Sequence, residues 1–99
     1  MTYRIVYARL TSRHFRSFSS RQRKIVFDAV DRHLAQEPAL ETKNRKRMRP
    51  NPLATWELRI GVLRVYYDVI PEPEPIVLVV AVGLKDRGLI RIAGEVATL

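Results

Sequence analysis

The chain of 99 residues has no cysteine, and it has only two histidines. A disulfide framework and a cysteine-ligated zinc site are therefore excluded as ways of stabilising so small a protein. The fold must rest on the packing of apolar side chains, which make up 46% of the sequence. A cysteine-free composition also fits a reducing compartment, so we expect a cytoplasmic protein.

Long apolar runs are also missing. The longest, Ile76–Leu84, is shorter than the about 18 residues that span a bilayer, and the first four residues lack the apolar core of a signal peptide. We therefore expect a soluble protein with no membrane partner. Because chains divide into separate cores only beyond about 250 residues, residues 1–99 are expected to form a single domain.

Acidic residues are scarce, with 10 Asp and Glu against 18 Lys and Arg, which leaves a net charge of +8. Such an excess attracts polyanions, meaning RNA, DNA or an acidic protein partner. A basic surface that only keeps the protein in solution is the alternative interpretation of the same excess.

Local patterns predict the N-terminal elements. Residues 3–7 are rich in β-branched and aromatic side chains and predict a strand, and a short helix is expected over 12–17. Ser19 and Gln22 match a capping box, in which each residue satisfies a free donor of the other at a helix start. A longer helix is therefore predicted from about residue 20 to 36, before Pro38 blocks its continuation.

The second half of the chain favours strands after a basic loop over 38–52. Apolar and polar residues alternate in 56–60 and 63–69, and a tight turn at Gly61–Val62 would place Arg59 opposite Arg64. Residues 76–82 are apolar throughout and predict a central strand that ends at Gly83, while 84–99 show no clear pattern. The order predicts an α+β fold, with an N-terminal strand and a helical hairpin packed on an antiparallel sheet that ends in a three-strand meander.

The sheet face away from the helices is expected to be polar and to hold the candidate site. Opposed Arg59 and Arg64 repel each other, and a bound anion would relieve the repulsion, although Glu57 and Asp68 on the same face could also neutralise the pair. Tyr66 beside them could stack on a base or donate to a phosphate, or could be an ordinary exposed tyrosine.

Other candidate chemistry is limited. The run Lys43–Arg49 carries five cations that could hold phosphates, although most basic loops are only solvated. His14 and His33 fall on the predicted helices, and His33, which interrupts an apolar stripe, is interpreted as structural. No spacing of metal ligands and no glycine-rich phosphate loop is present, so no metal and no cofactor is expected, and phosphate chemistry would have to use Lys, Arg and Tyr.

The chain resembles the RelE/ParE superfamily of bacterial type II toxins over nearly its whole length. The segments that carry the resemblance are Trp56–Gly61, Leu63–Val69 and Val80–Arg87, preceded by the basic residues 44–46 and 48–50. The resemblance implies a compact α+β toxin that a wrapping antitoxin neutralises. In the RelE-like branch the toxin enters the ribosomal A site and cuts messenger RNA with basic residues and no metal, as a messenger RNA interferase. In the ParE-like branch it inhibits DNA gyrase and has no nuclease activity, and an inactive binding module is a third alternative.

The resemblance also implies site residues. Arg64 matches the meander arginine of the ribonuclease branch, and we predict that Arg64 and Lys85 stabilise the charged phosphate while Lys46 helps to deprotonate the attacking 2′-hydroxyl. Two departures weaken a nuclease assignment: Glu57 replaces a lysine, and Arg91 stands near the position of a C-terminal tyrosine. The predicted RNA contacts are Lys43, Arg45, Arg47, Arg59, Tyr66, Arg87 and Arg91.

Charge predicts the partner as well. A protein at +8 should bind an acidic, partly disordered antitoxin that folds on contact and covers the basic sheet face. An antitoxin that docks on the helical side instead is the alternative.

Overall fold

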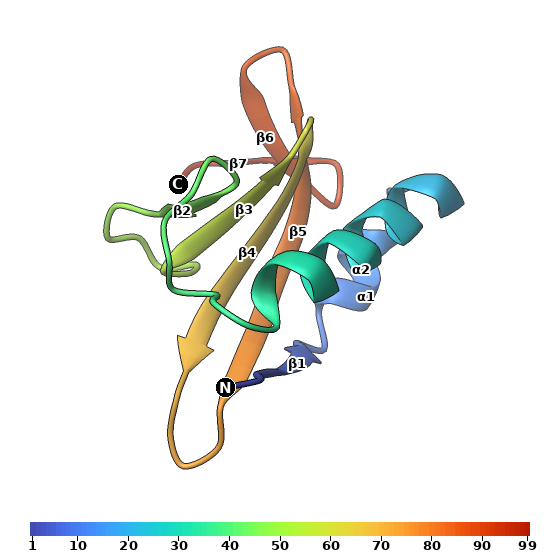
Figure 1. Cartoon of the computed structure of the whole chain (residues 1–99). Coiled ribbons are helices and arrows are strands. Elements are labelled where there is room, and N and C mark those ends of the chain that lie inside the picture. Colours follow the sequence, from blue (N-terminus) through green and yellow to red (C-terminus); the bar gives the residue numbers. More distant parts are fainter.

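The computed structural model describes all 99 residues as one sheet with two helices. The sheet order is β2-β3-β4-β5-β6-β7, and β1 pairs with β5 in parallel (Figure 1). The elements are β1 (Arg4–Tyr7), α1 (Thr11–Phe15), α2 (Ser20–Leu34), β2 (Arg45–Arg47), β3 (Trp56–Ile60), β4 (Leu63–Ile70), β5 (Ile76–Asp86), β6 (Leu89–Ile92) and β7 (Glu95–Ala97). This architecture confirms the predicted α+β class. Neither helix has the length and the apolar content that crossing a membrane requires.

The N-terminal predictions agree closely with the structure. The Ser19 hydroxyl accepts a hydrogen bond from the Gln22 backbone at 3.1 Å, and the Gln22 side chain accepts one from the Ser19 backbone at 2.9 Å. The capping box is thus confirmed and α2 begins at Ser20. Its buried residues are Val26, Ala29, Val30 and Leu34.

The main core lies between the helices and one face of the sheet. The fully buried sheet residues of this core include Leu58, Val65, Val77 and Val82, which form one cluster with the buried residues of α2. Burying each of these side chains stabilises the fold by about 1.5–3 kcal/mol. Tyr67 belongs to this core, and its hydroxyl donates to the Pro38 carbonyl at 2.7 Å, so the segment that follows α2 is held against the sheet.

The β3–β4 hairpin has the predicted register. Ile60 pairs with Leu63, and Arg59 pairs with Arg64. Gly61 at the turn has φ +56, a left-handed conformation that glycine adopts at little cost.

Two predictions for the second half are wrong. The basic loop over 38–52 contains the short strand β2, which pairs with β3. The central strand does not end at Gly83 but continues to Asp86, because β6 pairs with its last residues. The predicted meander is formed by β3, β4 and β5. The C-terminal residues, whose sequence shows no clear pattern, add the β6–β7 hairpin to it.

The sheet face opposite the helices is also less polar than predicted. Ala54, Tyr66 and Ala81 form a second, smaller core, against which Met48, Leu53, Val80, Ile90 and Ile92 pack. The loop after β2 and the β6 strand therefore cover the middle of this face and leave cationic side chains around it.

Candidate anion-binding site

A hollow of about 240 Å³ opens on the sheet face opposite the helices, and Arg59, Arg64 and Lys85 line it together with Glu57, Gly88 and Ile90. The strand register brings the three cations together. Arg59 lies opposite Arg64, and Arg64 lies opposite Gly83. Lys85 is two residues beyond Gly83 and so shares its face, because side chains alternate along a strand. The hollow thus has the chemistry of an anion site.

Arg64 is held firmly in this hollow. The residue is 8% exposed, and its Nη1 donates to the Gly61 carbonyl at 2.6 Å and to the Leu63 carbonyl at 2.9 Å. No other hydrogen bond within the chain uses its remaining donors. A fixed donor group of this kind stabilises developing negative charge without reorganisation.

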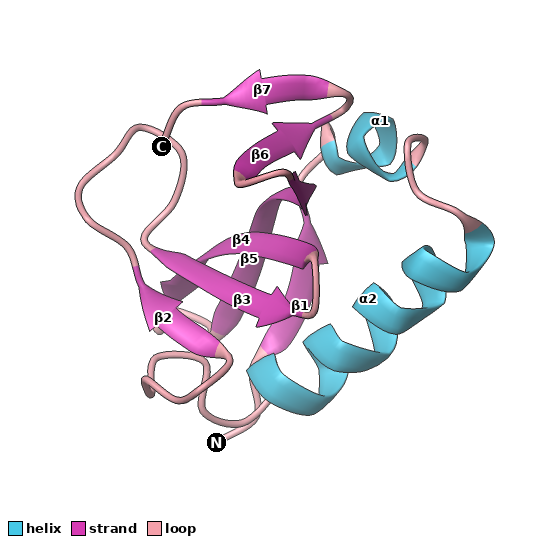
Figure 2. Cartoon of the chain, turned by 90° about the horizontal axis from the view of Figure 1, so that it is seen from above, coloured by secondary structure: helices cyan, strands magenta, loops and turns pink.

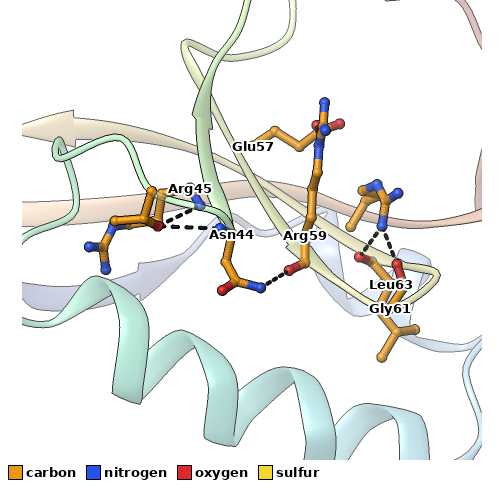
Figure 3. Close-up of polar contacts among 8 residues, drawn as sticks. Asn44, Arg45, Glu57, Arg59, Gly61 and Leu63 are labelled. Carbon is orange, nitrogen blue, oxygen red and sulfur yellow. Dashed lines mark hydrogen bonds and ion pairs between the residues drawn. The ribbon is translucent and has the colours of Figure 1, made fainter.

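Glu57 neutralises one of the three cations. Its Oε1 lies 2.6 Å from Arg59 Nε, and its side chain is 11% exposed against 51% for Arg59. Figure 3 shows Arg59 extending from β3 away from the helix, with its guanidinium beside Glu57. Asp68 does not take part, because its carboxylate accepts a hydrogen bond from the Thr55 backbone. Arg64 and Lys85 consequently have no carboxylate partner.

Tyr66 lies below this cluster rather than on the surface. The ring is fully buried in the smaller core, so the prediction of an accessible ring that stacks on a base is wrong. Its hydroxyl is buried without a hydrogen-bond partner. Burial is the main cause that raises the pKa of Tyr66, and the negative charge of Glu57 is the second. The positive charges of Arg64 and Arg59 lower the pKa by smaller amounts. The hydroxyl therefore stays protonated at neutral pH.

Lys46 lines a neighbouring hollow of about 260 Å³, with Arg49 among its other cations. Glu57 and Arg59 belong to both hollows, and Lys46 pairs with Glu57 across β2 and β3. Of the three predicted catalytic residues, the structure therefore brings Arg64 and Lys85 into one hollow and places Lys46 in the next. Arg49 was not among the predicted contacts, although it belongs to the basic run that predicted them.

The remaining predicted contacts lie apart from the Arg64 hollow. Arg45 and Arg47 pair with Leu58 and Trp56 and so share the helix-facing side of β2. The Arg47 guanidinium stacks over the Trp56 ring at 5.8 Å, and Arg47 also lines the hollow of Lys46. Arg91 lies on the opposite side of β6 from Ile90, and its Nε lies 3.6 Å from Asp86 Oδ2. Lys43 and Arg87 are exposed outside the hollow.

Arg45 has a structural function that its sequence context did not reveal. Its Nη1 donates to the His33 carbonyl near the end of α2 at 2.6 Å, and its Nε donates to the Leu40 carbonyl at 2.8 Å. These bonds satisfy a helix-terminal carbonyl and join α2 to the strand that carries Lys46.

Replacing Arg45 by Gln is expected to lower the free energy of unfolding by about 1–3 kcal/mol, because two charge-assisted hydrogen bonds are lost. Urea denaturation measures the change. The matched variant Arg47→Gln, which loses only a stacking contact, should change it by less than about 1 kcal/mol. Equal effects of the two substitutions would contradict the structural function of Arg45.

Both histidines lie on the helices, His14 on α1 and His33 on α2, as predicted. His14 Nδ1 accepts a hydrogen bond from the Val82 backbone at 3.4 Å, and burial followed by the charge of Arg13 lowers the pKa of His14. The pKa of His33 is lowered by burial and then by Arg32 and Arg45. No three side chains of His, Asp and Glu gather where they could hold a metal ion.

Comparison with known proteins identifies the fold. No family model and no curated protein sequence matches the chain. Among solved structures, it is similar to a chain of the toxin-antitoxin complex RelBE2 from Mycobacterium tuberculosis, with a TM-score of 0.65 and 19% identity, over 83% of this chain and 96% of that chain. The chain has a RelE-like α+β fold. The resemblance carried by the strand motifs is thus confirmed at the level of the fold, and the cationic hollow lies on the open face of a RelE-like sheet.

Proposed function

We propose that this chain is the toxin of a type II toxin-antitoxin system and that it cuts ribosome-bound messenger RNA. The observation that carries the proposal is the convergence of Arg59, Arg64 and Lys85 on one hollow in a RelE-like fold. Two of these cations have no carboxylate partner within the chain, so a phosphate is the ligand that their charge favours.

The proposed reaction is attack of a ribose 2′-hydroxyl on the adjacent phosphorus. The new bond joins the 2′-oxygen to phosphorus, the bond from phosphorus to the 5′-oxygen breaks, and the products carry a 2′,3′-cyclic phosphate and a 5′-hydroxyl. A base takes one proton from the 2′-oxygen, and the departing 5′-oxygen takes one proton from water. Arg64 and Lys85 would stabilise the charge that develops on the phosphoryl oxygens.

The base for this step is proposed to be Glu57. It lines the same hollow as Arg64 and Lys85, whereas Lys46 lines only the neighbouring one. A carboxylate can accept the 2′-hydroxyl proton directly, and Arg59 orients it. Lys46 would then contact the RNA strand beside the scissile phosphate.

Induction of the chain in a bacterial host, followed by primer extension on translated messages, tests the proposal. Growth arrest with new 5′ ends within translated messages is the expected result. Arrest with uncut messages would contradict the nuclease proposal, and the absence of any arrest would favour an inactive binding module.

Inhibition of DNA gyrase is a second candidate, because no tyrosine is available in the hollow. Tyr66 and Tyr67 are buried, neither Tyr3 nor Tyr7 lines the hollow, and Arg91 turns away from it. A tyrosine that transfers a proton is therefore missing. A supercoiling assay with excess protein separates the two candidates, since unchanged supercoiling would remove this one.

We further propose an acidic antitoxin as the partner, docked over the hollow so that it also blocks RNA. Replacing Arg59 and Arg64 together by Gln is expected to weaken antitoxin binding about tenfold and to flatten its salt dependence, because facing charges are lost. Titration at several salt concentrations measures both quantities, with thermal denaturation as the test of folding.

The variant Arg4→Gln/Arg32→Gln removes the same charge elsewhere and should bind like the original chain. Unchanged affinity and salt dependence in the Arg59/Arg64 variant would place the antitoxin on another surface, such as the helical side.

A further inference from the structure

The Tyr66 hydroxyl is a buried polar group that the proposed reaction does not use. It is the one buried side-chain nitrogen or oxygen of the chain without a hydrogen-bond partner. The neighbouring Tyr67 is equally buried, yet its hydroxyl donates to the Pro38 carbonyl at 2.7 Å. Buried polar groups are nearly always bonded, because an unpaired one loses its hydration without compensation. A phenylalanine would fill the same space without this cost, so the hydroxyl at position 66 needs an explanation.

The Tyr66 ring is fixed beneath the open face of the sheet. It packs with Ala54 and Ala81 in the smaller core, and Met48 and Leu53 from the loop between β2 and β3 pack against them. Figure 2 shows this loop on the side of the sheet away from α2. Because no part of Tyr66 is exposed, its hydroxyl can find a partner only among the groups around it.

Glu57 is the charged neighbour that can accept a hydrogen bond from this hydroxyl. The two residues pair directly across β3 and β4, so their side chains lie on the same face of the sheet. After burial, the charge of Glu57 is the largest cause that raises the pKa of Tyr66, which places the carboxylate close to the hydroxyl. Arg64 and Arg59 also act on it, but arginine has donors only.

The Glu57 carboxylate has an oxygen to spare. Its Oε1 accepts a hydrogen bond from Arg59 Nε at 2.6 Å, and its Oε2 accepts none from the chain. Lys46 lies opposite Glu57 on β2 but forms no ion pair with it. With its side chain only 11% exposed, Glu57 therefore depends on Arg59 for the compensation of its charge.

A phosphate in the hollow competes with Glu57 for Arg59. The Arg59 side chain is 51% exposed, and Figure 3 shows that it extends away from the helix. A guanidinium binds phosphate through two parallel donors, and Arg59 and Glu57 line the same hollow. If Arg59 turns to the phosphate, a nearly buried carboxylate loses its only bonded partner, which is a costly state.

We propose that Tyr66 is the positioning residue of Glu57, and that its hydroxyl donates to the carboxylate when a phosphate in the hollow takes Arg59. The inference rests on the proposed cleavage function, which makes Glu57 the base, and it names the group that holds this base in place. Tyr66 is covered and does not touch the RNA. It acts through Glu57, whose carboxylate stays aimed at the 2′-hydroxyl.

The first test is Tyr66→Phe, measured as cleavage of ribosome-bound messenger RNA in a purified translation system. The substitution should lower kcat about tenfold, a part of the about 10²- to 10⁴-fold that a general base contributes. KM should not change, because no contact with RNA is lost. In a Glu57→Gln background the same substitution should leave the residual rate unchanged, since a double-mutant cycle detects only groups that act together.

Tyr67→Phe is the matched control, because it removes a hydroxyl that is bonded within the core. Its melting temperature should fall while its kcat stays that of the original chain. Tyr66→Phe should show the reverse pattern, with a slower reaction and no loss of thermal stability, because its hydroxyl has no partner to lose in the chain without RNA.

The second test requires no cleavage and uses sulfate as the probe of the hollow. Nuclear magnetic resonance of chain with ¹³C-labelled tyrosine follows the Cζ signal of Tyr66, which reports the hydrogen bond of the hydroxyl. Saturating sulfate should shift this signal. The variant Arg59→Ala should show the shifted signal without sulfate, because Glu57 has then already lost Arg59. Thermal denaturation checks the folding of each variant.

Equal losses of rate in the original and the Glu57→Gln backgrounds would overturn the proposal, because Tyr66 would then act on the fold and not through the base. A Tyr66 signal that neither sulfate nor Arg59→Ala moves would also overturn it. The proposed function fails separately, if the original chain cuts no translated message. The sulfate-dependent shift would still support the contact between Tyr66 and Glu57 in that case.

Discussion

Replacing Arg64 by Lys is expected to slow cleavage of translated messenger RNA by about 10²- to 10³-fold, the usual loss when one positioned donor to the transition state is removed. Lysine keeps the charge, but it cannot both hold the Gly61 and Leu63 carbonyls and present further donors to a phosphate. The substitution therefore tests geometry and not charge. Primer extension after a fixed induction time and the growth of the host measure the effect.

Arg32→Lys is the control, because Arg32 is exposed on α2 and lines none of the hollows on the open face of the sheet. It should cut messages and arrest growth like the original chain. Full cleavage by the Arg64→Lys variant, at unchanged thermal stability, would show that Arg64 does not stabilise the reacting phosphate.

Replacing Gly83 by Ala is expected to lower the free energy of unfolding by about 1–3 kcal/mol, the range for an added methyl group in a packed site. A Cβ at this position would lie 2.7 Å from the Arg91 carbonyl oxygen and 3.0 Å from Ile92 Cγ1. The clash forces β6 away from β5, which also displaces Lys85 and Gly88 at the hollow. The melting temperature should fall by roughly 4–8 °C for each kcal/mol.

Gly61→Asn provides the comparison, because no atom lies within 4 Å of a Cβ at Gly61 and Asn tolerates the left-handed conformation found there. Its melting temperature should fall less than that of Gly83→Ala. An unaltered melting temperature for Gly83→Ala would mean that β6 does not pack against β5 as described.

Local signals in the sequence predicted much of the fold. The Ser19 and Gln22 pair located the start of α2 because a capping box involves neighbouring residues alone. The alternation in 56–60 and 63–69 and the Gly61 turn predicted the register of β3 and β4, because a two-residue turn determines which residues face each other. The pairing of Arg59 with Arg64 therefore follows from residues close together in the chain.

Contacts between distant residues escaped the same reasoning. The β2 strand has only three residues and forms because β3 offers it an edge, while β6 extends β5 past Gly83. Neither of these strand pairings can be predicted from a short stretch of the sequence. The apolar residues of the loop after β2 and of β6 that cover Tyr66 are likewise remote from it in sequence.

For this protein, the sequence by itself determined the class of the fold, the helix start, the β3–β4 register and the supply of cations, because each depends on neighbouring residues or on composition. The tertiary structure alone decided which cations meet. It placed Arg64 and Lys85 in one hollow and Lys46 in the next, turned Arg45 toward α2 and buried Tyr66. The physical reason is that a side chain's face and neighbours follow from pairing between strands and from packing between elements, which bring together residues far apart in the chain.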